Sequence, residues 1–315
     1  MIEDMSNDIA LAAKALAQGH LVAFPTETVY GLGADATNPL AVARIYSTKG
    51  RPPNHPLIVH VSSLEAALEW TSFRPEYLES LASAFWPGPM TLILKRSELA
   101  GDFITGSQDT VGVRVPRHPV ALELLRSFEA LGGKGVAAPS ANRFGKVSPT
   151  TAQAVSDELE DYFATDDLIL EGGQCEVGIE STIIDCTKAQ PAILRLGAVT
   201  ASMIEAATGL KLKSDEGEIR VSGSLKSHYS PDAKLVLNQT PVPGDGLIAL
   251  ANVETPVGVV RLASPKNSQE FAKQLYSALR GADEAGLQRV VAITPEGDEL
   301  AEAVIDRLSR ASFQG

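Results

Sequence analysis

Short apolar runs of strand length alternate with helix-like segments along most of this chain, and this alternation limits the fold more than any other feature of the sequence. The strand-like runs of the first 200 residues are LVAF, PLIVHV, MTLIL, TVGVRV, GVAA, STIIDC and AILRL. Between them, Asn38 and Pro39 read as the cap and first residue of a helix, and Asn7 or Asp8 can cap a helix that ends near Gln18. Because strands and helices intermingle without a fixed repeat, we expect an α/β domain of about 200 residues.

A second, smaller domain is predicted after it, since 315 residues exceed the usual size of one domain. Residues 209–231 have few apolar anchors and several Gly, Ser and Lys residues, a composition typical of a linker. Beyond them, the strand-like runs KLVL, GLIAL, VGVVRL and RVVAI are interspersed with two amphipathic helical segments. The expected organisation is therefore a large domain at residues 1–208, the linker, and a small βαβ-type domain at residues 232–315.

Composition argues against several classes of protein. The N-terminus is acidic where a signal peptide needs positive charge, and the apolar runs are far shorter than the roughly 18 residues that span a bilayer. Cys175 and Cys186 form no CxxC pair and have no histidines nearby, so neither a zinc site nor a disulfide framework is predicted. We expect a cytoplasmic protein with no membrane span and no metal-ligating side chains.

The charge distribution is uneven. The formal net charge of −12 argues against tight general binding to nucleic acid. Between Arg114 and Lys146, however, six basic residues stand against two acidic ones, and this stretch is a candidate for lining a cleft that takes an anionic ligand. The basic residues are Arg114, Arg117, Arg126, Lys134, Arg143 and Lys146. Residues 156–167 are acidic with scattered apolar residues, which is typical of a solvated helix face and loop.

No Walker sequence, protein-kinase signature or HExxH motif occurs, so a nucleotide would have to be held by loop cations and donors. Lys49 and Arg51 flank a glycine before paired prolines and suit that chemistry, although an ordinary surface turn has the same composition. In FPTETVYGLG (24–33), Thr26 and Thr28 present hydroxyls and the glycines permit close approach of a ligand to the backbone. A tight structural turn is the alternative there.

Two further segments can likewise be interpreted either as ligand-binding or as purely structural. Residues 138–150 (APSANRFGKVSPT) contain Ser140 and a Ser148 helix cap, and helix N-termini attract anions; an ordinary capped helix is the alternative. In TVGVRVPRHP, alternation places the valines on one face and Arg114 on the other. Arg114 can therefore hold a carboxylate with two hydrogen bonds or take part in a structural ion pair.

Together these segments resemble the threonylcarbamoyl-AMP synthase family, the YrdC-like enzymes, in its long two-domain form. The matching segments, in order, are FPTETVYGLG, STKGRPPNHPLIVHV, WPGPMTLIL, DTVGVRVPRHP, APSANRFGKVSPT, GIESTIID and ILRLG. The last 50 or so residues resemble the smaller domain of that family. The resemblance implies an α/β fold in which a YrdC-like twisted open sheet domain precedes a smaller Rossmann-like βαβ domain.

The resemblance also implies a reaction. A nucleotidyltransferase of this family, an L-threonylcarbamoyladenylate synthase, joins L-threonine, bicarbonate or CO2, and ATP with Mg²⁺ into threonylcarbamoyl-AMP and pyrophosphate. The product passes to a transferase that converts an adenosine of tRNA to threonylcarbamoyladenosine. We expect a monomer, because the small domain and the linker can already cover the cleft.

Roles for single residues follow from the same resemblance. The L-threonine pocket would consist of Thr28, His60, Arg114, Ala138 and Ser181. ATP would be held by Arg51, His55, Thr110, Ser140, Ser148, Arg195 and the linker residue Tyr229. Lys49, Arg51 and Arg195 would be catalytic, because a carbamate oxygen that attacks the α-phosphorus needs positioning and charge neutralisation.

Two other functions stay open. The basic run at 114–146 suggests an RNA-binding, translation-related protein without catalysis, although aromatic residues for base stacking make up only 5% of the chain. A domain of the same fold can instead activate carbamoyl phosphate, as in larger maturation enzymes that carry zinc-finger and acylphosphatase segments; this chain has neither segment.

Overall fold

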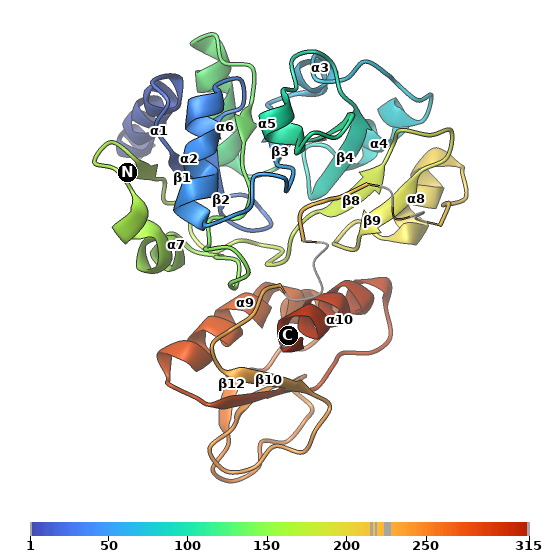
Figure 1. Cartoon of the computed structure of the whole chain (residues 1–315). Helices are drawn as coiled ribbons and strands as arrows, with labels where there is room; N and C mark the ends of the chain where they lie inside the picture. Colours follow the sequence, from blue (N-terminus) through green and yellow to red (C-terminus); the bar gives the residue numbers. More distant parts are fainter. Residues whose placement is uncertain (1, 215–216, 218, 224–227, 314–315) are drawn as a thin grey trace.

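The computed structural model describes residues 2–214, 217, 219–223 and 228–313. It contains a larger unit built around a nine-stranded sheet and a smaller unit built around a four-stranded sheet (Figure 1). The predicted linker at 209–231 includes residues 215–216, 218 and 224–227, which lie outside the described residues. The chain is therefore a mixed α/β protein, as its alternating pattern predicts.

The large unit holds most of the helices and strands. In chain order they are α1 (Ile2–Ala17), β1 (Val22–Phe24), β2 (Gly31–Asp35), α2 (Pro39–Lys49), β3 (Ile58–His60), α3 (Leu64–Leu68), α4 (Leu78–Phe85), β4 (Met90–Lys95), α5 (Asp102–Thr105), β5 (Thr110–Arg114), α6 (Pro119–Ala130), β6 (Val136–Ala137), α7 (Ala152–Leu159), the 3₁₀ helix η1 (Glu160–Tyr162), β7 (Leu168–Ile169), β8 (Thr182–Asp185), β9 (Ala192–Arg195) and α8 (Ala201–Thr208).

The nine strands follow the order β7-β1-β2-β6-β3-β5-β4-β8-β9 and form a mixed sheet. The pairs β1–β7, β3–β5 and β4–β8 are parallel, and the remaining neighbours are antiparallel. In the parallel pair β3–β5, His60 lies opposite Arg114. This register brings the last residues of two strands, far apart in sequence, to the same end of the sheet.

Both faces of this sheet are buried. Successive side chains at residues 21–24, in and just before β1, pack alternately into two different core clusters. Leu21 and Ala23 belong to a core cluster shared with α2 and α7, whereas Val22 and Phe24 belong to one shared with α1 and α6. Successive side chains of a strand point to opposite faces, so a continuous apolar run is what a sheet covered on both sides requires. Each fully buried side chain of this size contributes about 1.5–3 kcal/mol.

The small unit consists of β10 (Lys234–Leu237), β11 (Gly246–Ile248), β12 (Val260–Ala263), α9 (Ser268–Glu284), β13 (Arg289–Ala292) and α10 (Glu299–Ser312). Its strand order is β10-β13-β11-β12, and all three pairs are parallel. Parallel neighbours need crossover connections, and α9 forms part of the one between β12 and β13. In Figure 1 the helices α9 and α10 lie on the side of this sheet that faces the large unit.

A buried ion pair joins the two units. Nε of Arg307 on α10, whose side chain is 0% exposed, donates to Oε2 of Glu180 at 2.9 Å. The hydroxyls of Tyr276 on α9 and of Ser148 also donate to this carboxylate, at 2.9 and 2.7 Å. Burial alone would raise the pKa of Glu180, but the guanidinium groups of Arg307 and Arg195 and these hydrogen bonds lower it to about 2. The carboxylate therefore stays charged at neutral pH.

Three local expectations from the sequence are wrong. Helix α1 begins at Ile2, ahead of the caps expected at Asn7 or Asp8. The cap of α7 is Thr151, because the Ser148 hydroxyl is engaged by Glu180 instead. Within residues 156–167, Asp167 is buried rather than solvated and accepts hydrogen bonds from Arg44 and from backbone amides. The last two errors have the same cause, a tertiary contact that local sequence does not encode.

Replacing Arg307 by Met is expected to lower the free energy of unfolding by about 3–5 kcal/mol, because the buried Glu180 loses its charged partner. Urea unfolding followed by circular dichroism measures the change. The double variant Arg307→Met/Glu180→Gln is expected to lose less, since it leaves no unpaired charge. A single variant as stable as the unmodified protein would contradict this account of the interface.

Candidate active site

A pocket lies in the large unit and is lined in part by the described linker residues Ser222, Gly223, His228 and Tyr229. It collects ten of the 13 site residues predicted from the sequence. They are Thr28, Lys49, Arg51, His60, Arg114, Ala138, Ser140, Ser181, Arg195 and Tyr229. These residues come from segments spread over about 200 positions of the chain, so the fold rather than sequence proximity brings them together.

The other three predicted residues lie beside the pocket. Thr110 lines a neighbouring, more apolar cavity, which shares Ile58 and Ser222 with the first. The His55 ring packs edge-on against Phe144, a lining residue, with centroids 5.3 Å apart. Ser148 is one residue removed from the cavity, since its hydroxyl contacts the lining carboxylate of Glu180. Direct contact with a ligand in the main pocket is therefore not shown for these three.

The end of α2 explains the positions of the two loop cations. Gly50 adopts the left-handed conformation (φ 62°) that closes the helix, and its amide donates to Ser47 and Tyr46 carbonyls. A Cβ at Gly50 would come within 2.9 Å of Nη2 of Arg143. This sharp end lets Lys49, the last helical residue, and Arg51, just beyond it, both line the pocket.

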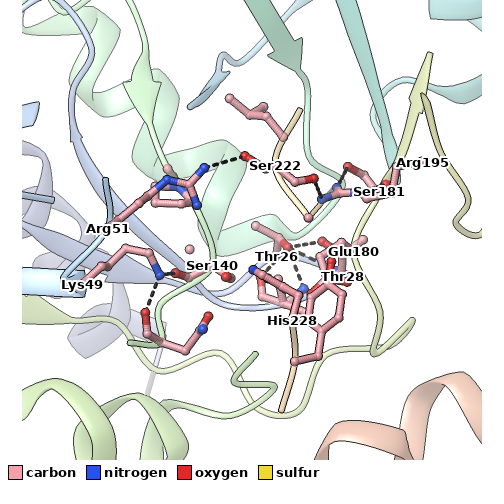
Figure 2. A pocket seen from close by; sticks show the side chains of 18 of the residues that line it. Thr26, Thr28, Lys49, Arg51, Ser140, Glu180, Ser181, Arg195, Ser222 and His228 are labelled. Carbon is pink, nitrogen blue, oxygen red and sulfur yellow. Dashed lines mark hydrogen bonds between the residues drawn. The ribbon is translucent and has the colours of Figure 1, made fainter. Parts of the chain in front are cut away.

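Lys49 is buried deep in the wall of the pocket. Its Nζ donates to the carbonyl oxygen of Ser140 at 2.6 Å and also to that of Asn142 (Figure 2). Burial is the main reason why the pKa of Lys49 falls well below its usual value, and the neighbouring Arg51 adds to this effect. Two carbonyl oxygens, rather than a carboxylate, thus offset the loss of solvent around this amine.

Arg51 and Arg195 meet at the linker. Nη2 of Arg51 donates to Oγ of Ser222 at 3.2 Å, and Nη1 of Arg195 donates to the backbone oxygen of the same residue at 2.9 Å (Figure 2). Arg195 also donates to both the backbone and the hydroxyl oxygen of Ser181, at 3.0 and 3.1 Å. Burial lowers the pKa of Arg51 to about 10, so this side chain remains protonated at neutral pH. The two guanidinium groups form a cationic end of the pocket.

Thr28, His60 and Arg114 form a second group of polar side chains in the lining of the same pocket. Nη1 of Arg114 donates to Oγ1 of Thr28 at 2.9 Å. His60 is 4% exposed, and its Nδ1 has no hydrogen-bond partner among the described residues. Burial, together with the nearby charge of Arg114, lowers the pKa of His60 to about 3. This imidazole is therefore neutral at physiological pH.

The linker residue Tyr229 is held between the two units. Its ring stacks on Tyr276 with centroids 5.6 Å apart, and the guanidinium of Arg307 lies 5.5 Å from its centroid. The residue has a positive φ of 63°, an uncommon conformation for a tyrosine. Its buried hydroxyl finds no partner among the described residues. The predicted linker tyrosine thus lies in the wall of the pocket.

Sequence reasoning missed several lining residues and misjudged one stretch. Glu180, Phe144, Ser222 and His228 line the pocket without having been predicted, although Glu180 and Phe144 lay in recognised segments. Of the six basic residues between positions 114 and 146, only Arg114 lines the pocket. The expectation that the whole stretch lines an anion cleft is therefore wrong. Arg117, Lys134 and Lys146 form exposed ion pairs instead.

Within the described part of the chain, no group of three or more His, Cys, Asp or Glu side chains could hold a metal ion. Two buried oxygens of the pocket, Oδ1 of Asn142 and the hydroxyl of Tyr229, have no hydrogen-bond partner among the described residues. No helix in the same residues is long and apolar enough to cross a membrane.

Family models and curated relatives match nearly the whole chain. The Sua5/YciO/YrdC family model, described as telomere recombination, matches residues 14–197, and a model described as the C-terminal domain of threonylcarbamoyl-AMP synthase matches residues 199–312. The threonylcarbamoyl-AMP synthase of Pyrococcus abyssi is 38% identical over 96% of this chain and 94% of its own length. That of Bacillus subtilis is 37% identical over 96% of this chain and 92% of its own length.

A solved structure supports the same conclusion. The crystal structure of Pyrococcus abyssi Sua5 complexed with L-threonine superposes with a TM-score of 0.86 at 36% identity. The alignment covers 98% of this chain and 94% of that one. The arrangement of both units is therefore shared, not only the fold of the larger one.

His60 makes the stability of the protein depend on pH in a defined direction. Below about pH 6.5 the unfolded state takes up a proton on this imidazole, whereas the folded state, with a pKa of about 3, does not. His60 therefore lowers the free energy of unfolding by up to about 1.4 kcal/mol per pH unit between pH 6.5 and 3. Urea unfolding of wild type and His60→Gln at several pH values should show a steeper acid dependence for wild type. Parallel curves would contradict the assignment.

Proposed function

The chain belongs to the threonylcarbamoyl-AMP synthase family, and from this membership we propose that it condenses L-threonine, bicarbonate or CO2, and ATP into threonylcarbamoyl-AMP and pyrophosphate. The observation that carries the proposal is that one pocket contains two different groups of polar side chains. Arg114, Thr28 and a neutral His60 form one group, and Arg51 and Arg195 form the other. An amino acid and a nucleotide can thus meet in a single cavity.

The residues around Arg114 suit a small zwitterion with a hydroxyl group. Arg114 takes the carboxylate of threonine, and Thr28 and the neutral His60 offer hydrogen-bonding atoms. Ala138 and Ser181 complete this subsite. The relative solved with L-threonine is similar over almost the whole chain, which supports this assignment.

We propose that Arg51, Arg195 and Ser140 take the phosphates of ATP. The oxygens of Ser222 already occupy the positions at which these arginines donate, so phosphate oxygens would replace them. The nucleoside would extend towards Thr110, His55 and Tyr229, and Ser148 would support this subsite through Glu180. The enzyme is then a nucleotidyltransferase without a P-loop.

The reaction proceeds in two bond-forming steps. The neutral amino group of threonine attacks the carbon of CO2, and the nitrogen then releases a proton to solvent to leave a carbamate. With bicarbonate, the same carbamate forms with loss of water. A carbamate oxygen then attacks the α-phosphorus of ATP, the bond to the β-phosphate oxygen breaks, and pyrophosphate leaves. Because anion attacks anion, the contribution of Lys49, Arg51 and Arg195 is positioning and charge neutralisation. No protein nucleophile is required.

Mg²⁺ is proposed as the ion that accompanies ATP. The pocket residues fit an ion held mainly by phosphate and water, with Asn142 Oδ1 as an available protein oxygen, because the carboxylate of Glu180 is engaged by Arg307, Tyr276 and Ser148. When bound, it would supply further neutralisation of phosphate charge.

The remaining parts of the proposal concern organisation and partners. Residues 1–208 would form the catalytic domain, 209–231 the linker and 232–315 the small domain. The acyl adenylate would be used by a transferase that modifies tRNA, and the protein would act as a cytoplasmic monomer. Two free, buried cysteines, Cys175 and Cys186, suit a reducing compartment. The RNA-binding alternative is not favoured, because three residues of the basic run, Arg117, Lys134 and Lys146, are already paired with carboxylates.

Pyrophosphate release should require L-threonine. The purified protein, supplied with ATP, Mg²⁺ and bicarbonate, is expected to release pyrophosphate with L-threonine and far less with L-valine or L-serine, and mass spectrometry should detect the acyl adenylate. Release independent of threonine would count against the synthase. Submicromolar binding of tRNA without any turnover would revive the RNA-binding alternative.

The variant Arg51→Ala should lower kcat on the order of 10², because one preorganised cation no longer faces the developing charge. A pyrophosphate release assay at saturating threonine and ATP measures this loss. Arg96→Ala serves as the control, since Arg96 pairs with Asp102 outside the pocket and its loss is expected to leave kcat unchanged. Near-wild-type turnover by Arg51→Ala would remove Arg51 from the catalytic group.

A further inference from the structure

We propose that Glu27 is a positioning residue of the amino-acid subsite: its buried carboxylate fixes the guanidinium of Arg114 in the orientation that receives the carboxylate of threonine. The inference rests on the proposed function. Glu27 itself does not line the pocket, so it acts through Arg114 rather than on a ligand.

The carboxylate of Glu27 is held on both oxygens. Oε1 accepts a hydrogen bond from Nη2 of Arg114 at 2.7 Å, and Oε2 accepts one from the backbone amide of Arg117 at 3.0 Å. The side chains of Glu27 and Arg114 are 1% and 5% exposed. A charge-assisted hydrogen bond excluded from water is stronger and more directional than one at the surface.

The backbone that carries Glu27 is fixed as well. Oγ1 of Thr26 accepts from the amides of Thr28 and Val29 at 3.2 Å each, and the carbonyl oxygen of Glu27 accepts from the Val177 amide at 2.8 Å. The carboxylate therefore acts as a fixed reference for the arginine. In the sequence PTET, the acidic residue serves this purpose while the threonines face the pocket.

A count of donors shows what remains for a ligand. A guanidinium group has five N–H donors. In Arg114, Nε donates to the Gly88 carbonyl at 3.3 Å, Nη1 to Thr28 and Nη2 to Glu27. One N–H group on each terminal nitrogen is left, and such a pair suits both oxygens of one carboxylate. Without Glu27, rotation of the guanidinium would no longer be restrained on the Nη2 side.

The charge of Glu27 also makes the surroundings of Arg114 differ from those of Arg51 and Arg195. Arg114 carries a buried carboxylate partner, whereas the hydrogen-bond partners found for Arg51 and Arg195 are backbone carbonyl and hydroxyl oxygens. A phosphate chain with several negative charges is therefore favoured at Arg51 and Arg195. The singly charged carboxylate of an amino acid is favoured at Arg114, whose own charge is already balanced.

Glu27→Gln tests the proposal, because it keeps the shape of the side chain and removes its charge. Calorimetry should show L-threonine binding weakened by about tenfold, the change expected when one charge-assisted hydrogen bond of an otherwise intact site is lost. The KM for threonine should rise correspondingly, while the KM for ATP stays within about twofold. A role confined to stability would change neither threonine binding nor the ratio of the two KM values.

Asp167→Asn is the matched control. Asp167 is a second buried carboxylate that accepts from an arginine, Arg44, at 2.6 Å and from the backbone amides of Leu21 and Ala164, but it lies outside the pocket. The Asp167→Asn variant should have a lower free energy of unfolding than the unmodified protein, while its threonine binding stays unchanged. If Glu27→Gln does not fold, Glu27→Asp keeps the charge but shortens the side chain, and the same selective weakening of threonine binding is expected.

Three outcomes would contradict the proposed role of Glu27. Unchanged threonine affinity in folded Glu27→Gln or Glu27→Asp overturns the inference, and so does parallel weakening of threonine and ATP. If wild type meanwhile releases pyrophosphate in a threonine-dependent way, the proposed function stands without it. Wild-type protein that neither binds threonine nor turns over in its presence overturns both.

Discussion

Four basic side chains lie buried around one pocket, and the need to offset their removal from water governs the surrounding structure. Lys49, Arg51, Arg114 and Arg195 are all between 2% and 7% exposed. A buried charge without compensation costs several kcal/mol, so each one must be matched by oxygens of the protein. The loops, strand ends and linker that supply these oxygens are the same segments that shape the pocket.

The kind of compensation differs from one cation to the next. Arg114 has a carboxylate, Lys49 has backbone carbonyl oxygens, and Arg51 and Arg195 share the oxygens of Ser222. Hydrogen bonds to neutral oxygens leave most of the positive charge unbalanced, whereas a carboxylate cancels it. The hydrogen-bond partners therefore differ in charge between Arg114 and the pair Arg51 and Arg195.

Local patterns in the sequence predict most of this fold and much of the site. The alternation of apolar runs gives the strands, Asn38–Pro39 marks the start of α2, and the order of motifs points to the pocket residues. Long-range contacts explain what the patterns do not give. Nothing near Ser148 indicates that its hydroxyl bonds to Glu180 rather than capping a helix, and nothing near Asp167 indicates its pairing with Arg44. Neither pairing is encoded within a window of neighbouring residues.

The small unit completes the wall of the pocket through a chain of direct contacts. Arg307 and Tyr276 both bind Glu180, and both also pack against the ring of Tyr229. Glu180 precedes Ser181, whose hydroxyl accepts from Arg195. A shift of α9 and α10 would therefore move the linker tyrosine and disturb the segment that orients Arg195. Because these contacts are buried and charged, they tolerate little misalignment, and the geometry of the cationic end depends on the docking of the second unit.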